Sequence, residues 1–154
     1  YWPSNYGGRK KAIPKRAATA QLIVKEISTI LSQDASAEIV LLGDFNEDPD
    51  EMNVQSLKTV GLTSLMEPML GTPNVGTYVY SGEDLFYDQI IVSEGLKGKK
   101  GLGFDSESVM ILDLPKYRQQ EGDYAHYPFR FWAGNSLLGG YSDHLAVRVT
   151  IIKI

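Results

Sequence analysis

One short stretch decides the fold of this chain: Ile39-Val40-Leu41-Leu42-Gly43-Asp44-Phe45-Asn46. Its first four residues form an apolar run rich in β-branched side chains, which is typical of a strand buried on both faces. The run stops at Gly43, and two polar side chains, Asp44 and Asn46, follow it directly. Proteins of the α/β class place functional groups at such points, because the strand fixes the group while the loop leaves it open.

Helices are predicted on either side of this strand. Residues 3–16 are polar and basic and favour a loop. Apolar residues at three- and four-residue steps then predict an amphipathic helix over residues 15–32. Asp50 is the expected N-cap of a second helix over residues 51–59, which Gly61 ends.

Further strands are predicted along the rest of the chain. Apolar and β-branched runs bounded by turn residues place them at residues 77–80, 88–92, 108–112 and 145–152. Residues 94–103 are a loop rich in Gly and Lys, and residues 115–140 are irregular, aromatic and Gly-rich. Two helices with several strands and no dividing linker predict one domain of the α/β (α+β) class.

Length and composition exclude several classes of protein. The 154 residues suffice for one domain with a core, and 43% hydrophobic with 22% charged residues excludes a disordered chain or a fibre. A net charge of −4 argues against a sequence-independent nucleic-acid coat, which needs a basic surface. Without cysteine there is no disulfide, no thiolate zinc site and no thiol catalysis.

The start of the chain suggests a segment of a longer protein. It opens with Tyr1-Trp2-Pro3-Ser4, without an initiator Met and without the basic and apolar regions of a signal peptide. No stretch approaches about 18 apolar residues, so we expect no transmembrane segment. The sequence therefore predicts a soluble chain of undetermined compartment, whose parent protein could be secreted or periplasmic.

Chemistry-bearing side chains gather at three strand ends. Asp44 and Asn46 follow the strand at 39–42, Asp88 opens the strand at 88–92, and Ser142-Asp143-His144 opens the last strand. Carboxylate and amide oxygens suit a hard cation, and a histidine can move or hold a proton near neutral pH. This set predicts hydrolysis assisted by a divalent metal.

Each of these residues also has a purely structural interpretation. Asp44 with Asn46 is compatible with a simple turn, Asp88 with a strand cap, and His144 with a hydrogen-bonded turn residue. A calcium loop beginning at Asp44 is excluded, because it needs Gly at its sixth position and Glu at its twelfth, where this chain has Pro49 and Gln55. The second histidine, His126, is interpreted as structural or surface.

Three segments in this order resemble the endonuclease/exonuclease/phosphatase superfamily, which includes deoxyribonuclease I, abasic-site endonucleases, bacterial sphingomyelinases and inositol-phosphate phosphatases. They are Leu41-Leu42-Gly43-Asp44-Phe45-Asn46, Tyr87-Asp88-Gln89-Ile90-Ile91-Val92-Ser93 and Tyr141-Ser142-Asp143-His144. The opening residues resemble bacterial members of the group. The resemblance implies a deoxyribonuclease I-like fold, a two-sheet β-sandwich flanked by helices. Residues 1–154 would form its C-terminal half, and the N-terminal part would be absent from this chain.

The resemblance also implies roles for the residues before the first helix and after the first strand. Asp44 matches the carboxylate that orients or deprotonates the attacking water, and Asn46 matches an amide that holds the phosphate. Tyr1 falls where the family has a His or Tyr that hydrogen-bonds the phosphate. Asn5 stands where the bacterial relatives often carry Arg.

The remaining implied roles lie toward the end of the chain. Asp143 matches a carboxylate close to the metal, His144 the imidazole that contacts the phosphate, and Asp88 the carboxylate that orients this imidazole. The implied cofactor is Mg²⁺, with Mn²⁺ as an alternative. The family's metal-binding Glu lies in the N-terminal part and is not found in this chain.

Taken together, the sequence predicts a metal-dependent phosphoesterase. The first hypothesis for its reaction is phosphodiester hydrolysis by in-line attack of an activated water. Alternatives are a phospholipase C-like or inositol-phosphate phosphatase, or a non-catalytic module that binds a phosphate or a partner. The expected partner is a phosphate-ester substrate, with nucleic acid as one candidate. We expect the full-length parent to be active and this segment alone to be inactive. The strands at 39–42, 88–92 and 145–152 would leave an apolar sheet face, covered by the missing half or by self-association.

Overall fold

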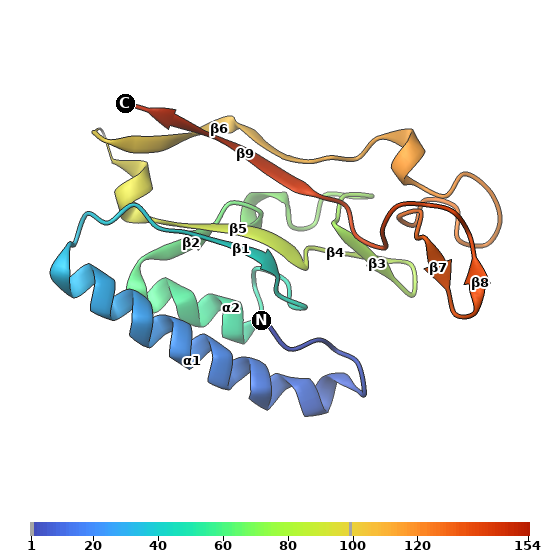
Figure 1. Ribbon diagram of the computed structural model, residues 1–154, viewed down its shortest axis with the longest axis horizontal. Coiled ribbons are helices and arrows are strands. Elements are labelled where there is room, and N and C mark those ends of the chain that lie inside the picture. The colour runs from blue at the N-terminus through green and yellow to red at the C-terminus, as the bar shows by residue number, and fades with distance from the viewer. Residues whose placement is uncertain (1, 99) are drawn as a thin grey trace.

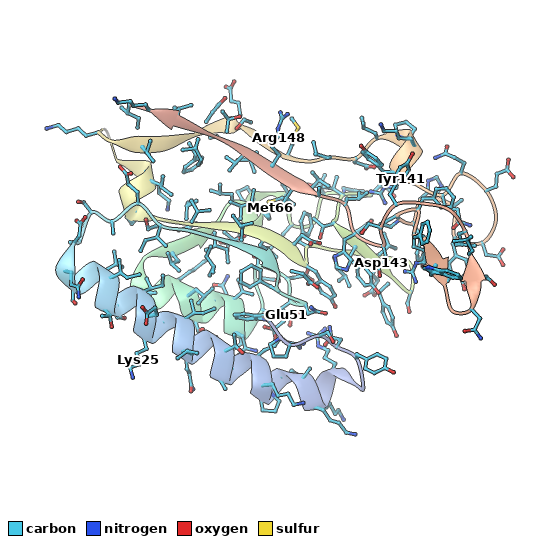
Figure 2. All side chains as sticks on the ribbon, viewed as in Figure 1. Lys25, Glu51, Met66, Tyr141, Asp143 and Arg148 are labelled. Atoms are coloured by element: carbon cyan, nitrogen blue, oxygen red, sulfur yellow. The ribbon has the colours of Figure 1, made fainter. Side chains whose placement is uncertain are left out.

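The computed structural model describes residues 2–98 and 100–154, and these residues stack in three layers (Figure 1). The long helix α1 and the short helix α2 form one outer layer, a three-stranded sheet forms the middle, and the strand pair β6–β9 forms the other outer layer. The predicted mixed α/β class is therefore confirmed. Met66 lies in the middle of the molecule, whereas Lys25 points away from the sheet on the outer side of α1 (Figure 2).

The helices are α1 (Arg9–Gln33) and α2 (Met52–Gln55), with 3₁₀ turns at Ser56–Val60, Glu67–Met69, Glu94–Lys97 and Pro115–Tyr117. The strands are β1 (Val40–Asp44), β2 (Leu62–Ser64), β3 (Tyr78–Tyr80), β4 (Glu83–Leu85), β5 (Asp88–Ser93), β6 (Leu102–Ile111), β7 (Trp132–Ala133), β8 (Ser136–Leu137) and β9 (Val147–Lys153). Among the described residues, no helix combines the length and the apolar character that crossing a bilayer requires.

The middle sheet has the order β1-β5-β2, and all its pairs are antiparallel. In the β1–β5 register, Leu42 lies opposite Ile90 and Asp44 lies opposite Asp88. This register brings two carboxylates from distant parts of the sequence to one end of the sheet. The hairpin β3–β4 lies beyond that end, and β7–β8 forms a second small hairpin (Figure 1).

Strand β5 carries core residues on both of its faces, because successive side chains of a strand point in opposite directions. Ile91 packs into a cluster with Ala20 and Ile27 of α1. Ile90 and Val92 belong to a second cluster, against which side chains of β6 and β9 pack. The central position of β5 explains its continuous apolar sequence.

One expectation about apolar surface is wrong, and a second holds only for part of the sheet. The strand at 39–42 is not buried on both faces, since β1 is an edge strand on which Val40 is 38% and Leu42 is 67% exposed. The expected uncovered apolar face is covered at β5, where side chains of β6 and β9 of this same chain pack on Ile90 and Val92. Exposed apolar side chains lie instead on β1 and at the end of β9, at Ile151 and Ile152. An apolar run reports a preference for burial but not whether its strand lies at the centre or at the edge.

Local boundaries also differ from the predictions. The expected loop at 3–16 is helical from Arg9, whose side chain pairs with Glu51 at 2.6 Å. Asp50 is not an N-cap: the cap of α2 is Glu51, which makes no side-chain capping bond. The loop at 94–103 includes a 3₁₀ turn and the start of β6, and the irregular segment at 115–140 contains β7 and β8.

Candidate functional site

Asp88 and His144 form a hydrogen-bonded pair at the end of the middle sheet. Asp88 is the first residue of β5, and His144 lies in the loop before β9. The Oδ2 atom of Asp88 is 2.6 Å from Nδ1 of His144. Because a carboxylate only accepts hydrogen bonds, Nδ1 is the donor. The other ring nitrogen, Nε2, is thereby left for a ligand, and this pairing is the one expected from the sequence.

The neighbouring strand β3 holds His144 in place through Tyr78. Its backbone pairs with Tyr78 in an antiparallel bridge, and its ring lies 4.7 Å from the Tyr78 ring. Burial alone would lower the pKa of His144, but the hydrogen bond and charge of Asp88, with the charges of Asp44 and Asp143, outweigh it and raise this pKa. A raised pKa favours the imidazolium, which can donate a hydrogen bond from Nε2 to an anion.

Asp44, the last residue of β1, and Asn46 form a tight turn at the end of this strand. The backbone N–H of Asn46 donates to Asp44 Oδ1 at 2.8 Å, and its side-chain Nδ2 donates to Asp44 Oδ2 at 2.9 Å. Asn46 has a φ of 51°, a left-handed conformation in which Asn is one of the few favoured residues. The second hydrogen on Nδ2 therefore has a fixed direction.

The charge state of Asp44 is coupled to the other acidic groups. Partial burial raises its pKa, hydrogen bonds from Asn46 and the His144 charge oppose this, and the nearby Asp88 carboxylate adds to the rise. Asp44 remains exposed to solvent at the cleft. Two carboxylates facing each other across paired strands repel, and a cationic imidazole close to both relieves this repulsion.

One cleft of about 840 Å³ brings the candidate residues together. Asp44, Asn46, Asp143 and His144 line it, and Asp88 lies behind His144. In Figure 2, Asp143 lies beside the β3–β4 hairpin, at the end of the molecule away from the C-terminus. The remaining candidate from the sequence, Tyr1, lies outside the described residues.

A buried ion pair holds Glu47, the residue that follows Asn46 in the chain. The side chain of Arg16 in α1 is fully buried, and its Nε lies 3.0 Å from Glu47 Oε1. Glu47 also accepts a hydrogen bond from Asn53 at 2.8 Å. Burial raises the pKa of Glu47, and the hydrogen bond from Asn53 and the charge of Arg16 oppose the rise. Since Glu47 follows Asn46 in the chain, the pair anchors the turn on which Asn46 stands.

The described residues do not by themselves complete a site for a divalent cation. Among residues 2–98 and 100–154, no group of three or more His, Cys, Asp or Glu side chains is arranged to hold a metal ion. Both oxygens of Asp44 accept bonds from Asn46, and one oxygen of Asp88 is bonded to His144. Asp143 is exposed in the cleft. A hard cation needs about six oxygen ligands, so this donor set does not fit a closed site.

Comparison with known proteins identifies the family. A sequence profile described as the Endonuclease/Exonuclease/phosphatase family matches residues 1–153. The chain belongs to this family. No curated protein and no solved structure gives a significant match. Membership of the endonuclease/exonuclease/phosphatase family supports a hydrolase role on phosphate esters, and it confirms the resemblance drawn from the three ordered segments.

Several residues that shape the cleft were given no role from the sequence. Tyr78, Tyr80, Tyr87 and Asn5 line the cleft, and the Asn5 side chain donates to the backbone oxygen of Asn46. The alternation in residues 77–80 places Tyr78 and Tyr80 on one face of β3, which could have indicated a shared surface. Nothing in the sequence indicates the contact of Asn5, because its partners lie far along the chain.

Proposed function

We propose that the cleft hydrolyses a phosphodiester by in-line attack of an activated water. The observation that carries the proposal is the Asp88–His144 pair opening into the same cleft as Asp44 and Asn46. A phosphodiester is an anion, so its hydrolysis requires donors aimed at the charge that grows on the phosphoryl oxygens.

In this proposal the chain's own residues perform two tasks: they bind the phosphate oxygens, and they orient the attacking water. The imidazolium of His144 donates from Nε2 to a non-bridging oxygen, and the free hydrogen on Asn46 Nδ2 holds another. Asp44 orients the attacking water from the neighbouring position. The proton of that water passes to Asp44, because an imidazolium carries a hydrogen on each ring nitrogen and has no site to accept another. If His144 instead stands neutral, with its Nδ1 hydrogen on Asp88, its Nε2 atom is the acceptor.

A requirement for Mg²⁺ or Mn²⁺ belongs to the proposal, with Asp143 as one ligand. The other ligands would come from water, substrate or residues beyond those described, because the described donor set is incomplete. The cleft is rich in carboxylates, and an anionic substrate would be repelled from it without a compensating cation. The proposal therefore concerns the full-length protein.

Exposed aromatic side chains favour nucleic acid as the substrate class. Tyr6 and Tyr80 line the cleft and are 97% and 63% exposed. Base stacking on such rings tolerates any sequence and adds affinity beyond the phosphate contacts. The competing candidate is a module that binds a phosphate without turnover, which the incomplete metal donor set favours.

The test is hydrolysis by the full-length protein of DNA, RNA, sphingomyelin and inositol phosphates, with magnesium and with a chelator. Asp44→Asn and His144→Ala should each lower kcat/KM by roughly 100-fold or more, since charge stabilisation and proton transfer each contribute several kcal/mol. Asp50→Asn and His126→Ala are matched controls outside the cleft and should leave the rate unchanged. Turnover that survives both cleft variants would refute the proposal, and phosphate binding without turnover would support the non-catalytic module.

A further inference from the structure

A chain of hydrogen bonds leads from buried Arg16 to the hydroxyl of Tyr87. Arg16 Nη1 donates to Asn5 Oδ1 at 2.9 Å. Because a guanidinium carries only donors, the Asn5 atom that faces it must be the amide oxygen. The amide nitrogen of Asn5 is therefore turned the other way, where it lies 3.2 Å from the Tyr87 hydroxyl and 3.2 Å from the backbone oxygen of Asn46.

This arrangement fixes the direction of the Tyr87 hydroxyl hydrogen. The amide nitrogen of Asn5 can only donate, so the Tyr87 oxygen accepts and its own hydrogen must point elsewhere. None of the hydrogen bonds formed within residues 2–98 and 100–154 uses this hydrogen, and Tyr87 lines the cleft beside Asn46 and His144. Burial, with the charge of Asp48, raises the pKa of Tyr87, so the phenol keeps its proton at neutral pH.

Packing holds the Tyr87 ring rigidly with respect to the other donors. The ring stacks on Tyr78 with centroids 5.3 Å apart and planes 15° apart, and Tyr78 in turn packs on His144. The backbone oxygen of Tyr87 accepts a hydrogen bond from Phe45 N at 2.7 Å, which ties it to the turn that carries Asn46.

We infer that Tyr87 is a phosphate-binding residue, whose hydroxyl donates to a phosphate oxygen in the cleft together with the Asn46 amide and the His144 imidazole. Asn5 and Arg16 are positioning residues that aim this hydroxyl. The inference deepens the proposed function and rests on it, because it adds a third donor to the same site. Three converging donors match an anion with several oxygens better than they match a neutral group.

The first experiment compares two Tyr→Phe substitutions in the full-length protein. The probes are inorganic phosphate, titrated by calorimetry, and a chromogenic phosphodiester for kinetics. Tyr87→Phe keeps the stacked ring and should weaken phosphate binding and lower kcat/KM by roughly 10- to 100-fold, the effect of losing a hydrogen bond to a charged group. Tyr127→Phe removes a hydroxyl that accepts one hydrogen bond, from Gly82 N at 2.7 Å, outside the cleft, and should change neither.

A second variant tests the positioning of the hydroxyl. Asn5→Asp keeps an oxygen facing Arg16, but its other oxygen would accept the Tyr87 hydrogen and turn it away from the cleft. Phosphate binding should fall, and combining Asn5→Asp with Tyr87→Phe should cost clearly less than the two separate effects together. Full additivity would overturn the positioning role, since a general electrostatic effect of the new carboxylate adds to the loss of the hydroxyl.

The outcomes separate this inference from the proposed function. Wild-type protein that binds phosphate through Tyr87 but hydrolyses no ester would refute the proposed function and leave the inference standing. If the wild type hydrolyses the ester and Tyr87→Phe does so at the same rate, the inference is refuted and the proposed function stands. Wild-type protein that does not bind phosphate would overturn the inference, and melting curves of each variant exclude misfolding as the cause of a loss.

Discussion

Replacing Asp88 with Asn is the sharpest perturbation of the proposed catalytic pair, Asp88 and His144. The Asp88 and His144 side chains are 20% and 24% exposed, and their hydrogen bond is 2.6 Å long. Asn has the same shape and preserves the bond from the backbone N–H of residue 88 to Thr77 Oγ1. The substitution therefore removes the negative charge with little change in packing.

The expected magnitude follows from this contact. A hydrogen bond to a charged group contributes about 1.5–3 kcal/mol, which corresponds to a loss of roughly 10- to 150-fold in kcat/KM. Burial lowers the pKa of His144, and the hydrogen bond and charge of Asp88 are the largest contributions that oppose this. Without them the pKa of His144 falls, so the imidazolium loses its proton at a lower pH.

Two assays check this expectation. The descending limb of the pH–rate profile should move to lower pH in Asp88→Asn, because less imidazolium is present at any given pH. Titration of the imidazole NMR signals should show the same displacement for His144, whereas the His126 signal serves as an internal control outside the pair. A His144 titration that stays in place or moves to higher pH would refute this account of the pair.

Three further predictions concern stability and association. Arg16→Met leaves the Glu47 carboxylate buried without its partner and should lower the free energy of unfolding by about 3–5 kcal/mol in urea titrations, and a loss below about 1 kcal/mol would contradict the account. The folded state raises the pKa of His144, so its pairing should stabilise the protein fully below the ordinary pKa of 6.5 and lose this effect as the pH rises through the folded-state pKa. His144→Gln should therefore lower the free energy of unfolding more at about pH 5 than at about pH 9, and an equal loss at the two pH values would contradict this prediction. Leu42 is 67% exposed on the edge strand β1, so Leu42→Lys should reduce self-association of the isolated chain in light scattering without lowering its melting temperature, and undiminished association would show that another surface is responsible.

Part of the fold could be predicted because the relevant information is local. The apolar run at residues 90–92 predicts strand β5, and the polar residue Asp88, shortly before this run, marks where the strand begins. The pairing of Asp88 with His144 came from the order of three family segments rather than from any local pattern. Strands β2 and β4, with three residues each, are too short for periodicity to reveal.

The rest depends on contacts between distant residues. The extension of α1 to Arg9 coincides with an ion pair to Glu51, 42 positions away, and the Asn5–Tyr87 bond spans 82 positions. The burial of Arg16 contradicts what its charge suggests. Its ion pair with Glu47 and its hydrogen bonds to Asn5 and Pro3 make this burial tolerable. Whether Leu42 lies inside or at an edge depends on which strand pairs beside it, which its own sequence does not specify.

Hydrolysis in ¹⁸O-labelled water tests the central claim most directly. The full-length protein is given a phosphodiester in labelled water with magnesium, and the products are analysed by mass spectrometry. The account predicts one labelled oxygen on the phosphate of the product, because water attacks phosphorus, and negligible labelled product from His144→Ala. Label in the alcohol product, or labelled phosphate formed equally by wild type and His144→Ala, would contradict the assignment of phosphoester hydrolysis to this cleft.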